Sequence, residues 1–231
     1  MIISLKDWQR YTKKLSSLSE KAVDEFRKWI NENGGYANMD RDTIIEYAYA
    51  LARKYGEGSA TLSAAMYDAV AILQNASVPS AIPAETATYQ QVAKKVNGII
   101  KNTASDEILA QSVGLLVKNA GEKTIIENAQ RDRAEIAFIP HGATCAYCIT
   151  LGSKGWKDAY DEELEKDGEP VHLHANCDCT YGVRFNDKLK YKGYNEKKYQ
   201  KMYYNAPLRD GEKNTAENRM KALRRKLEGR E

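Results

Sequence analysis

PHGATCAYC at residues 140–148 and HLHANCDC at residues 172–179 hold all four cysteines and all three histidines of this 231-residue chain. Outside these two runs, no residue can supply a thiolate or an imidazole. Such an uneven distribution indicates that these side chains serve one purpose at one place. We therefore expect the two runs to meet in the folded protein.

The spacing of these residues is typical of a zinc site. Cys145 and Cys148 form a C-x2-C pair, and after 25 intervening residues His174, Cys177 and Cys179 form H-x2-C-x-C. Zinc binds four sulfur or nitrogen ligands in a tetrahedron, and a C-x2-C pair fits one turn of backbone around the ion. Five candidates compete for four positions, and the sequence leaves open which four bind. A closed shell of protein ligands would make the zinc structural, whereas catalysis needs an open position.

Two other interpretations of the cysteines remain open. They could be buried thiols without a metal, or the C-x2-C pair could be redox-active, although no thioredoxin-like βαβ pattern precedes it. His141 and His172 are more typical of surface or hydrogen-bonded histidines than of ligands. The chain begins MIISLKD, without the basic and apolar regions of a secretory signal, so we expect folding in a reducing cytosol, where clustered cysteines favour metal binding.

Composition places the chain among ordinary globular proteins, with 42% hydrophobic and 29% charged residues and room for one large domain or two small ones. The sequence contains no run of about 18 apolar residues, so we expect no membrane span. The net charge of +3 is uneven: residues 186–231 hold 14 Lys and Arg against 7 Asp and Glu, a local +7, which leaves −4 for the rest. Such a basic tail favours contact with nucleic acid or an acidic protein, or forms a solvated helical surface.

The motifs of several enzyme classes are missing. A zinc deaminase needs H-x-E before P-C-x-x-C, but no histidine precedes His141. A zinc protease needs H-E-x-x-H and many serine hydrolases carry G-x-S-x-G, and the sequence contains neither. An HNH-type nuclease needs a histidine on a later helix, and none follows His174. We therefore expect that the protein is not an enzyme.

Apolar periodicity predicts that the first 130 residues are helical. Apolar residues at three- and four-residue steps recur over six segments: 5–30, 40–55, 62–73, 85–100, 105–121 and 122–131. Gly34, Gly56 and Gly121 follow three of these segments and are expected to end helices. The third segment has the clearest stripe, which we expect to be plain core packing with alanines that let a neighbouring helix approach: Leu62, Ala65, Met66, Ala69, Val70 and Leu73.

The pattern changes after residue 130. Residues 134–139 and 180–185 are short, apolar and rich in β-branched residues, so they predict two strands that pair or lie next to each other. Residues 159–166 predict a short helix between them. We therefore expect an α+β fold with three parts: a helical domain over residues 1–130, a small zinc-stabilised Cys/His module over residues 131–186, and a basic helical tail over residues 187–231.

Three motifs resemble the C-terminal signature of the Mu F-like, or head-morphogenesis, minor capsid proteins of tailed phages: FIPHGATCAYC at residues 138–148, GSKGW at 152–156 and H-x-H-A-N-C-D-C at 172–179. The helical half also resembles members of this family at ARKYG, residues 52–56, and AMYD, residues 65–68. The resemblance implies a virion component rather than a free enzyme, present in a few copies and associated with the portal, scaffold or major capsid protein. It further implies that the protein assists DNA during packaging or ejection.

The resemblance therefore implies a phage minor capsid protein inside the virion, assembled in the bacterial cytoplasm. The cysteine spacing adds the expectation of a structural zinc ion, and we expect no membrane partner for the protein. Its basic, tyrosine-rich tail would lie beside packaged DNA and make salt-sensitive phosphate contacts. Tyr199 and Tyr203, four residues apart, equally favour packing of the tail on the body. Two alternatives remain: a zinc-dependent HNH-like nuclease, suggested by His172 and His174 beside the C-x2-C pair, and a zinc-stabilised DNA-binding module.

Overall fold

The computed structural model describes all 231 residues except 103–104, 142–143, 161–164, 167–168, 171–178 and 231. Its α-helices are α1 (Leu5–Glu32), α2 (Arg41–Leu73), α3 (Tyr89–Asn102), α4 (Asp106–Asp132), α5 (Ala146–Gly152), α6 (Glu196–Tyr204) and α7 (Ala216–Leu227). Its strands are β1 (Ile2–Ile3), β2 (Glu135–Ile139), β3 (Lys157–Asp158), β4 (Glu165–Lys166), β5 (Glu169–Pro170), β6 (Thr180–Arg184) and β7 (Lys190–Tyr191). The protein is mostly helical with a small sheet region, so the expected α+β class is confirmed.

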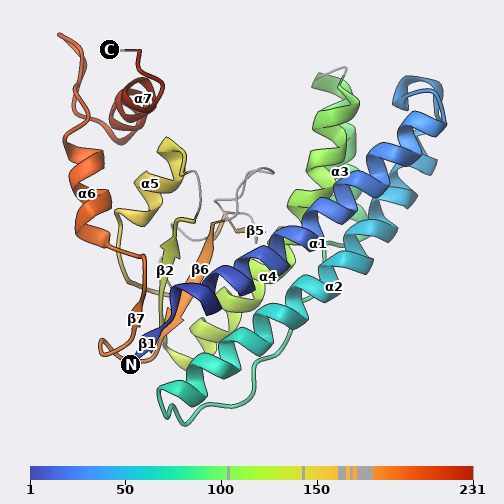
Figure 1. Cartoon of the computed structure of the whole chain (residues 1–231). Coiled ribbons are helices and arrows are strands. Elements are labelled where there is room, and N and C mark those ends of the chain that lie inside the picture. Colours follow the sequence, from blue (N-terminus) through green and yellow to red (C-terminus); the bar gives the residue numbers. More distant parts are fainter. Residues whose placement is uncertain (103–104, 142–143, 161–164, 167–168, 171–178, 231) are drawn as a thin grey trace.

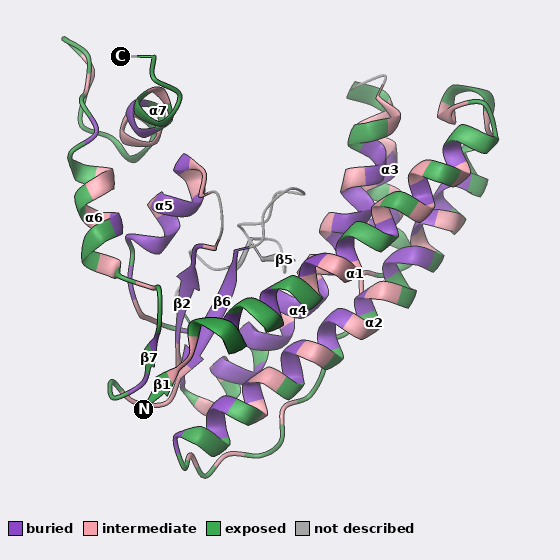
Figure 2. Cartoon of the chain, in the orientation of Figure 1, coloured by how far each residue is buried: buried purple, intermediate pink, exposed green. Residues whose placement is uncertain are grey.

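Three long helices, α1, α2 and α4, lie side by side and form the body, and α3 packs on α2 and α4 at one end (Figure 1). Each long helix begins after a side chain that accepts a hydrogen bond from its first turn: Ser4, Asp40 and Ser105. Gly34 follows the end of α1 with a φ of 78°, as expected of a glycine that ends a helix. Buried residues line the facing sides of the three helices (Figure 2).

Two glycines expected to end helices lie inside them instead. α2 continues through Gly56 and α4 through Gly121, so four predicted segments form two helices. A Cβ atom at Gly121 would lie 2.6 Å from Ser59 Oγ and 2.9 Å from Ser63 Oγ, and one at Gly56 would lie 2.9 Å from Thr86 Cγ2. The prediction was wrong because close packing, and not a helix end, requires a glycine at both positions.

The clearest apolar stripe of the sequence faces the core only in part. Val70 is buried, and Leu62 and Met66 are partly buried and pack against the same core cluster. Ala65 and Ala69 are exposed, and Leu73 is 40% exposed, so the predicted core packing is wrong for these three residues. The side of α2 that contacts α4 carries Ser59, Ser63 and Tyr67, each at most 1% exposed. Ser59 and Ser63 lie beside Gly121, where α4 approaches closely and only small side chains fit.

β2 pairs antiparallel with β6 along its whole length, from Glu135 opposite Arg184 to Ile139 opposite Thr180. The two predicted strands and their pairing are therefore confirmed. β3 pairs with the other edge of β2, which gives the strand order β3-β2-β6. β1 pairs parallel with β7, so the N-terminus of the chain lies beside residues 190–191.

The short helix expected over residues 159–166 is wrong at its end. Glu165 and Lys166 form β4, which pairs antiparallel with β5 three residues further on. This local pairing satisfies backbone N–H and C=O groups that a helix would otherwise have paired. The middle of that predicted helix, residues 161–164, lies outside the described residues.

α6 and α7 pack on α5 rather than extending into solvent. Their contacts form a small core of six buried residues: Ala146, Ile149, Tyr199, Ala206, Ala222 and Leu223. Another core cluster joins residues of α1, α2 and α4 to residues of β2 and β6, so apolar packing continues across residue 130. The division into three domains stays a prediction. Within the described residues, no helix has the length and apolar character needed to cross a membrane.

Candidate functional site

The pairing of β2 with β6 brings parts of the two cysteine-bearing runs to one end of the sheet. β2 ends at Ile139, directly opposite the start of β6 at Thr180, so the residues that follow β2 meet those that precede β6. The backbone N–H of His141 donates to Cys179 Sγ at 3.2 Å, and Cys179 Sγ in turn donates to the carbonyl oxygen of His141 at 3.8 Å. The expectation that the runs meet is confirmed at this contact.

The first pair of predicted ligands lies at the start of α5. Cys145 is the N-cap residue of this helix, and the backbone N–H of Cys148 donates to Cys145 Sγ at 3.4 Å. Cys148 and Cys179 are 1% and 4% exposed and belong to one apolar cluster, against which Cys145 packs. Cys145 Sγ and Cys179 Sγ each accept a backbone hydrogen bond, as a thiolate ligand can, and Cys179 would give up the bond that it donates to His141 on binding a metal.

Two of the five predicted zinc ligands, His174 and Cys177, lie outside the described residues, as does His172. Among the residues that the structure does describe, no three His, Cys, Asp or Glu side chains are grouped so that they could hold a metal ion. The donor set formed by Cys145, Cys148 and Cys179 with the remaining two candidates is chemically suited to zinc, and the site itself stays a prediction.

A buried carboxylate connects the Cys179 segment to the helical body, and the sequence analysis missed it. Glu122 of α4 is 4% exposed, and its Oε2 accepts a hydrogen bond from the backbone N–H of Tyr181 at 3.1 Å. Burial, together with the negative charge of Glu122, raises the pKa of Tyr11, whose hydroxyl lies 3.0 Å from Ser63 Oγ. The sequence analysis missed Glu122 because it expected a helix to end at Gly121, whereas α4 continues through Glu122 and turns its side chain inward.

Tyrosines of the tail fasten it to the sheet and to α5. The hydroxyl of Tyr191 donates to the carbonyl oxygen of Val183 at 2.7 Å and accepts from its N–H at 3.0 Å, so one side chain satisfies the outer edge of β6. Burial raises the pKa of Tyr191. Tyr194 donates to the carbonyl oxygen of Gly152 at 3.0 Å, and Tyr199 is buried against α5. Tyr203 packs against the same small core, so the packing interpretation of Tyr199 and Tyr203 is confirmed, and these contacts explain how residues far along the chain support the helix that carries Cys145.

The basic residues of the tail remain largely in solvent. The exposed ones on the two terminal helices are Lys197, Lys198 and Lys201 of α6 and Lys221, Arg224 and Lys226 of α7. Arg225 differs from them, because it forms a partly buried ion pair with Glu212 at 2.9 Å. The tail therefore combines an apolar side that packs on α5 with a basic side that can attract polyanions.

A protein-family model described as VG15 protein matches residues 2–206, which include the whole helical body, the sheet and both cysteine-bearing runs. The matched region ends after α6 and before α7. Comparisons with curated proteins and with solved structures gave no match.

Proposed function

Because the chain belongs to the VG15 protein family, a family of viral proteins, we propose that it is a phage minor capsid protein that acts in head morphogenesis. The observation that carries the proposal is the family match over residues 2–206. The motifs at residues 138–148 and 172–179, which resemble those of Mu F-like minor capsid proteins, support this finer assignment. We propose a structural role without enzymatic activity.

In this proposal the protein lies inside the capsid, bound to the portal, scaffold or major capsid protein. The close approach of α2 and α4 supports a structural role, because closely packed helices form a rigid body that a partner can bind without large rearrangement. The exposed lysines and arginines of α6 and α7 would contact phosphates of packaged DNA during packaging or ejection. Such contacts carry no sequence information and weaken steeply with salt.

We also propose that a structural zinc ion joins the two cysteine-bearing runs. Cys145 and Cys148 would bind it together with ligands drawn from His174, Cys177 and Cys179. The pairing of β2 with β6 supports this arrangement, since it holds residues of both runs at the same end of the sheet. A zinc ion bound there would contribute folding free energy, because its ligands come together only in the folded chain.

The capsid assignment is tested by mass spectrometry of purified phage particles. Virions and procapsids are separated by sedimentation, and peptides of this chain are quantified against those of the major capsid protein. We expect a few copies per particle in both fractions. Absence of the chain from virions and from procapsids would refute the proposal.

The zinc proposal is tested by metal analysis of the full chain purified without a chelator. We expect about one zinc per chain for the natural protein and much less for Cys148→Ser. His141→Ala is the matched control, because its side chain is not a proposed ligand and its backbone hydrogen bond to Cys179 is retained. Zinc absorption-edge spectroscopy of the natural protein gives a readout that does not depend on a variant folding. A spectrum without sulfur ligands, or metal-free natural protein, contradicts the proposal.

The absence of enzymatic activity is tested with linear and circular DNA in the presence of Mg²⁺, Mn²⁺ or Zn²⁺. Intact DNA is the expected result. Cleavage that disappears when His174 is replaced by Ala would favour the HNH-like alternative instead.

A further inference from the structure

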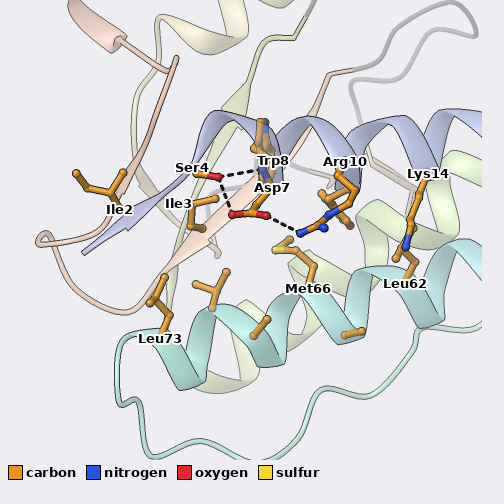
Figure 3. A pocket seen from close by; sticks show the side chains of 14 residues that line it. Ile2, Ile3, Ser4, Asp7, Trp8, Arg10, Lys14, Leu62, Met66 and Leu73 are labelled. Atoms are coloured by element: carbon orange, nitrogen blue, oxygen red, sulfur yellow. Dashed lines mark hydrogen bonds and ion pairs between the residues drawn. The ribbon is translucent and has the colours of Figure 1, made fainter.

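A groove runs between the first turns of α1 and the last turns of α2, with β1 at one end (Figure 3). Its volume is about 460 Å³. Figure 3 shows that Leu62 and Met66 rise from α2 toward α1, and that Arg10 and Lys14 extend from α1 toward α2. Most of the lining is apolar and includes Ile3, Trp8, Leu62, Met66, Ala69 and Leu73.

The groove exposes the most regular apolar stripe of the protein. Ile2 and Leu73, near one end of the groove, are 66% and 40% exposed, and Ala65 and Ala69 on its floor are exposed as well. A helical stripe of this regularity is normally covered by another element. Contiguous exposed apolar surface of this kind marks a site of interaction with a partner.

The α1 side of the groove is basic. The charged side chains that line it are Arg10, Lys14 and Asp7, a net +1. Arg10 pairs with Asp7, whereas Lys14 makes no ion pair with any residue that the structure describes. On the α2 side, the one acidic residue between Leu62 and Leu73 is Asp68, which accepts a hydrogen bond from the backbone of Ala81 and does not line the groove.

The other exposed helices of this protein have the wrong charge to fill the groove of a second copy. α3 carries three lysines and no acidic residue, α6 three lysines against one glutamate, and α7 five basic residues against one glutamate. Each would bring positive charge toward Arg10 and Lys14. Like charges placed together at an interface oppose binding, so the charge of the groove favours an acidic helix from a different chain over these three helices.

We propose that this groove binds an acidic amphipathic helix of a partner protein. Its apolar side chains would lie along the floor from Leu62 to Leu73, a length of about 17 Å or three helical turns. Ala65 and Ala69 leave room for its backbone to approach closely, and its carboxylates would face Lys14 and Arg10. Recognition of this kind takes apolar anchors at helical spacing for affinity and flanking charges for selectivity. The inference goes beyond the proposed function and does not depend on the zinc ion.

The probe for this proposal is a synthetic helical peptide of about 15 residues with leucine and alanine on one face and glutamate on its flanks. A second peptide with every glutamate replaced by lysine has the same apolar face. Binding of each labelled peptide to the full chain is measured by fluorescence anisotropy. We expect the acidic peptide to bind at least about tenfold more tightly at about 50 mM salt, with a preference that shrinks as salt is added.

Three variants link this binding to the groove. Ala69→Gln fills the floor with a longer, uncharged side chain at an exposed helical position and should weaken binding of the acidic peptide by about tenfold or more. Ala50→Gln makes the same change at an exposed position of α2 outside the groove and should leave binding unchanged. Lys14→Glu should reduce or reverse the preference for the acidic peptide.

Three results would overturn the proposal. One is equal affinity for the two peptides, and another is binding of the acidic peptide that Ala69→Gln does not weaken. The third is a dimer of the full chain in analytical ultracentrifugation that Ala69→Gln dissociates, since the groove would then hold a second copy.

Discussion

Replacing Gly121 with alanine tests the close approach of α4 to α2, which determines how the body of this protein is packed. The new Cβ atom would lie 2.6 Å from Ser59 Oγ and 2.9 Å from Ser63 Oγ, with the Ser59 carbonyl oxygen 3.4 Å away. Both hydroxyls would have to rotate or the helices would have to separate. Rotation of Ser63 breaks its hydrogen bond with Tyr11, where the two oxygens lie 3.0 Å apart.

The magnitude follows from three contributions. Overpacking a close contact costs about 1–3 kcal/mol, and loss of the hydrogen bond costs about 1 kcal/mol. Alanine is favoured over glycine inside a helix by about 1 kcal/mol, which offsets part of this cost. We expect the free energy of unfolding to fall by about 1–3 kcal/mol and Tm to fall by about 2–12 °C.

Gly98→Ala is the matched control, because a Cβ atom at Gly98 of α3 would meet no atom within 4 Å. The same substitution should there raise the free energy of unfolding by up to about 1 kcal/mol. Urea unfolding monitored by circular dichroism measures both variants. Adding Ser59→Ala to Gly121→Ala should recover about 1 kcal/mol through relief of the nearest contact. If Gly121→Ala stabilised the protein as much as Gly98→Ala does, the proposed packing of α2 on α4 would be wrong.

Three further predictions concern the contacts around the candidate site. Glu122→Ala leaves a buried backbone N–H of β6 without its acceptor and should lower the free energy of unfolding by about 1–3 kcal/mol in urea; an unchanged midpoint contradicts this. Burial raises the pKa of Tyr11, Tyr67 and Tyr191, so these phenols ionise above about pH 10 only in the unfolded chain. The contribution of these buried phenols to the free energy of unfolding should be fully present below about pH 10. Above it, the free energy of unfolding should fall by up to about 1.4 kcal/mol per pH unit for each tyrosine, and Tyr11→Phe should make this decrease smaller by the share of one tyrosine. Leu223→Ala in α7 should cost about 2–5 kcal/mol because this leucine is 1% exposed, whereas a loss below about 0.5 kcal/mol would mean that α7 is a solvated tail.

The cysteine spacing predicted the meeting of the two runs, and strand pairing accounts for the part of it that the structure describes. Short apolar segments with β-branched residues, one before the first cysteine-bearing run and one after the second, were enough to predict β2 and β6, because strand preference is a local property. The contact between His141 and Cys179 then follows from the register of the two strands. Glu122 could not be found in this way, since its partner lies 59 residues away and nothing in the local sequence indicates it.

Local chemistry in the chain was sufficient to predict that the first half is helical and that two strands pair, and the sequence itself places every cysteine and histidine between residues 141 and 179. The face of α2 that is buried, and the role of Gly56 and Gly121, were settled by contacts between distant segments. A glycine that ends a helix and a glycine that admits a neighbouring helix look alike in sequence, since both roles depend on the missing Cβ. In the same way, an apolar stripe from Leu62 to Leu73 shows that a helix has an apolar side, while the distance to α1 leaves part of that side as an open groove.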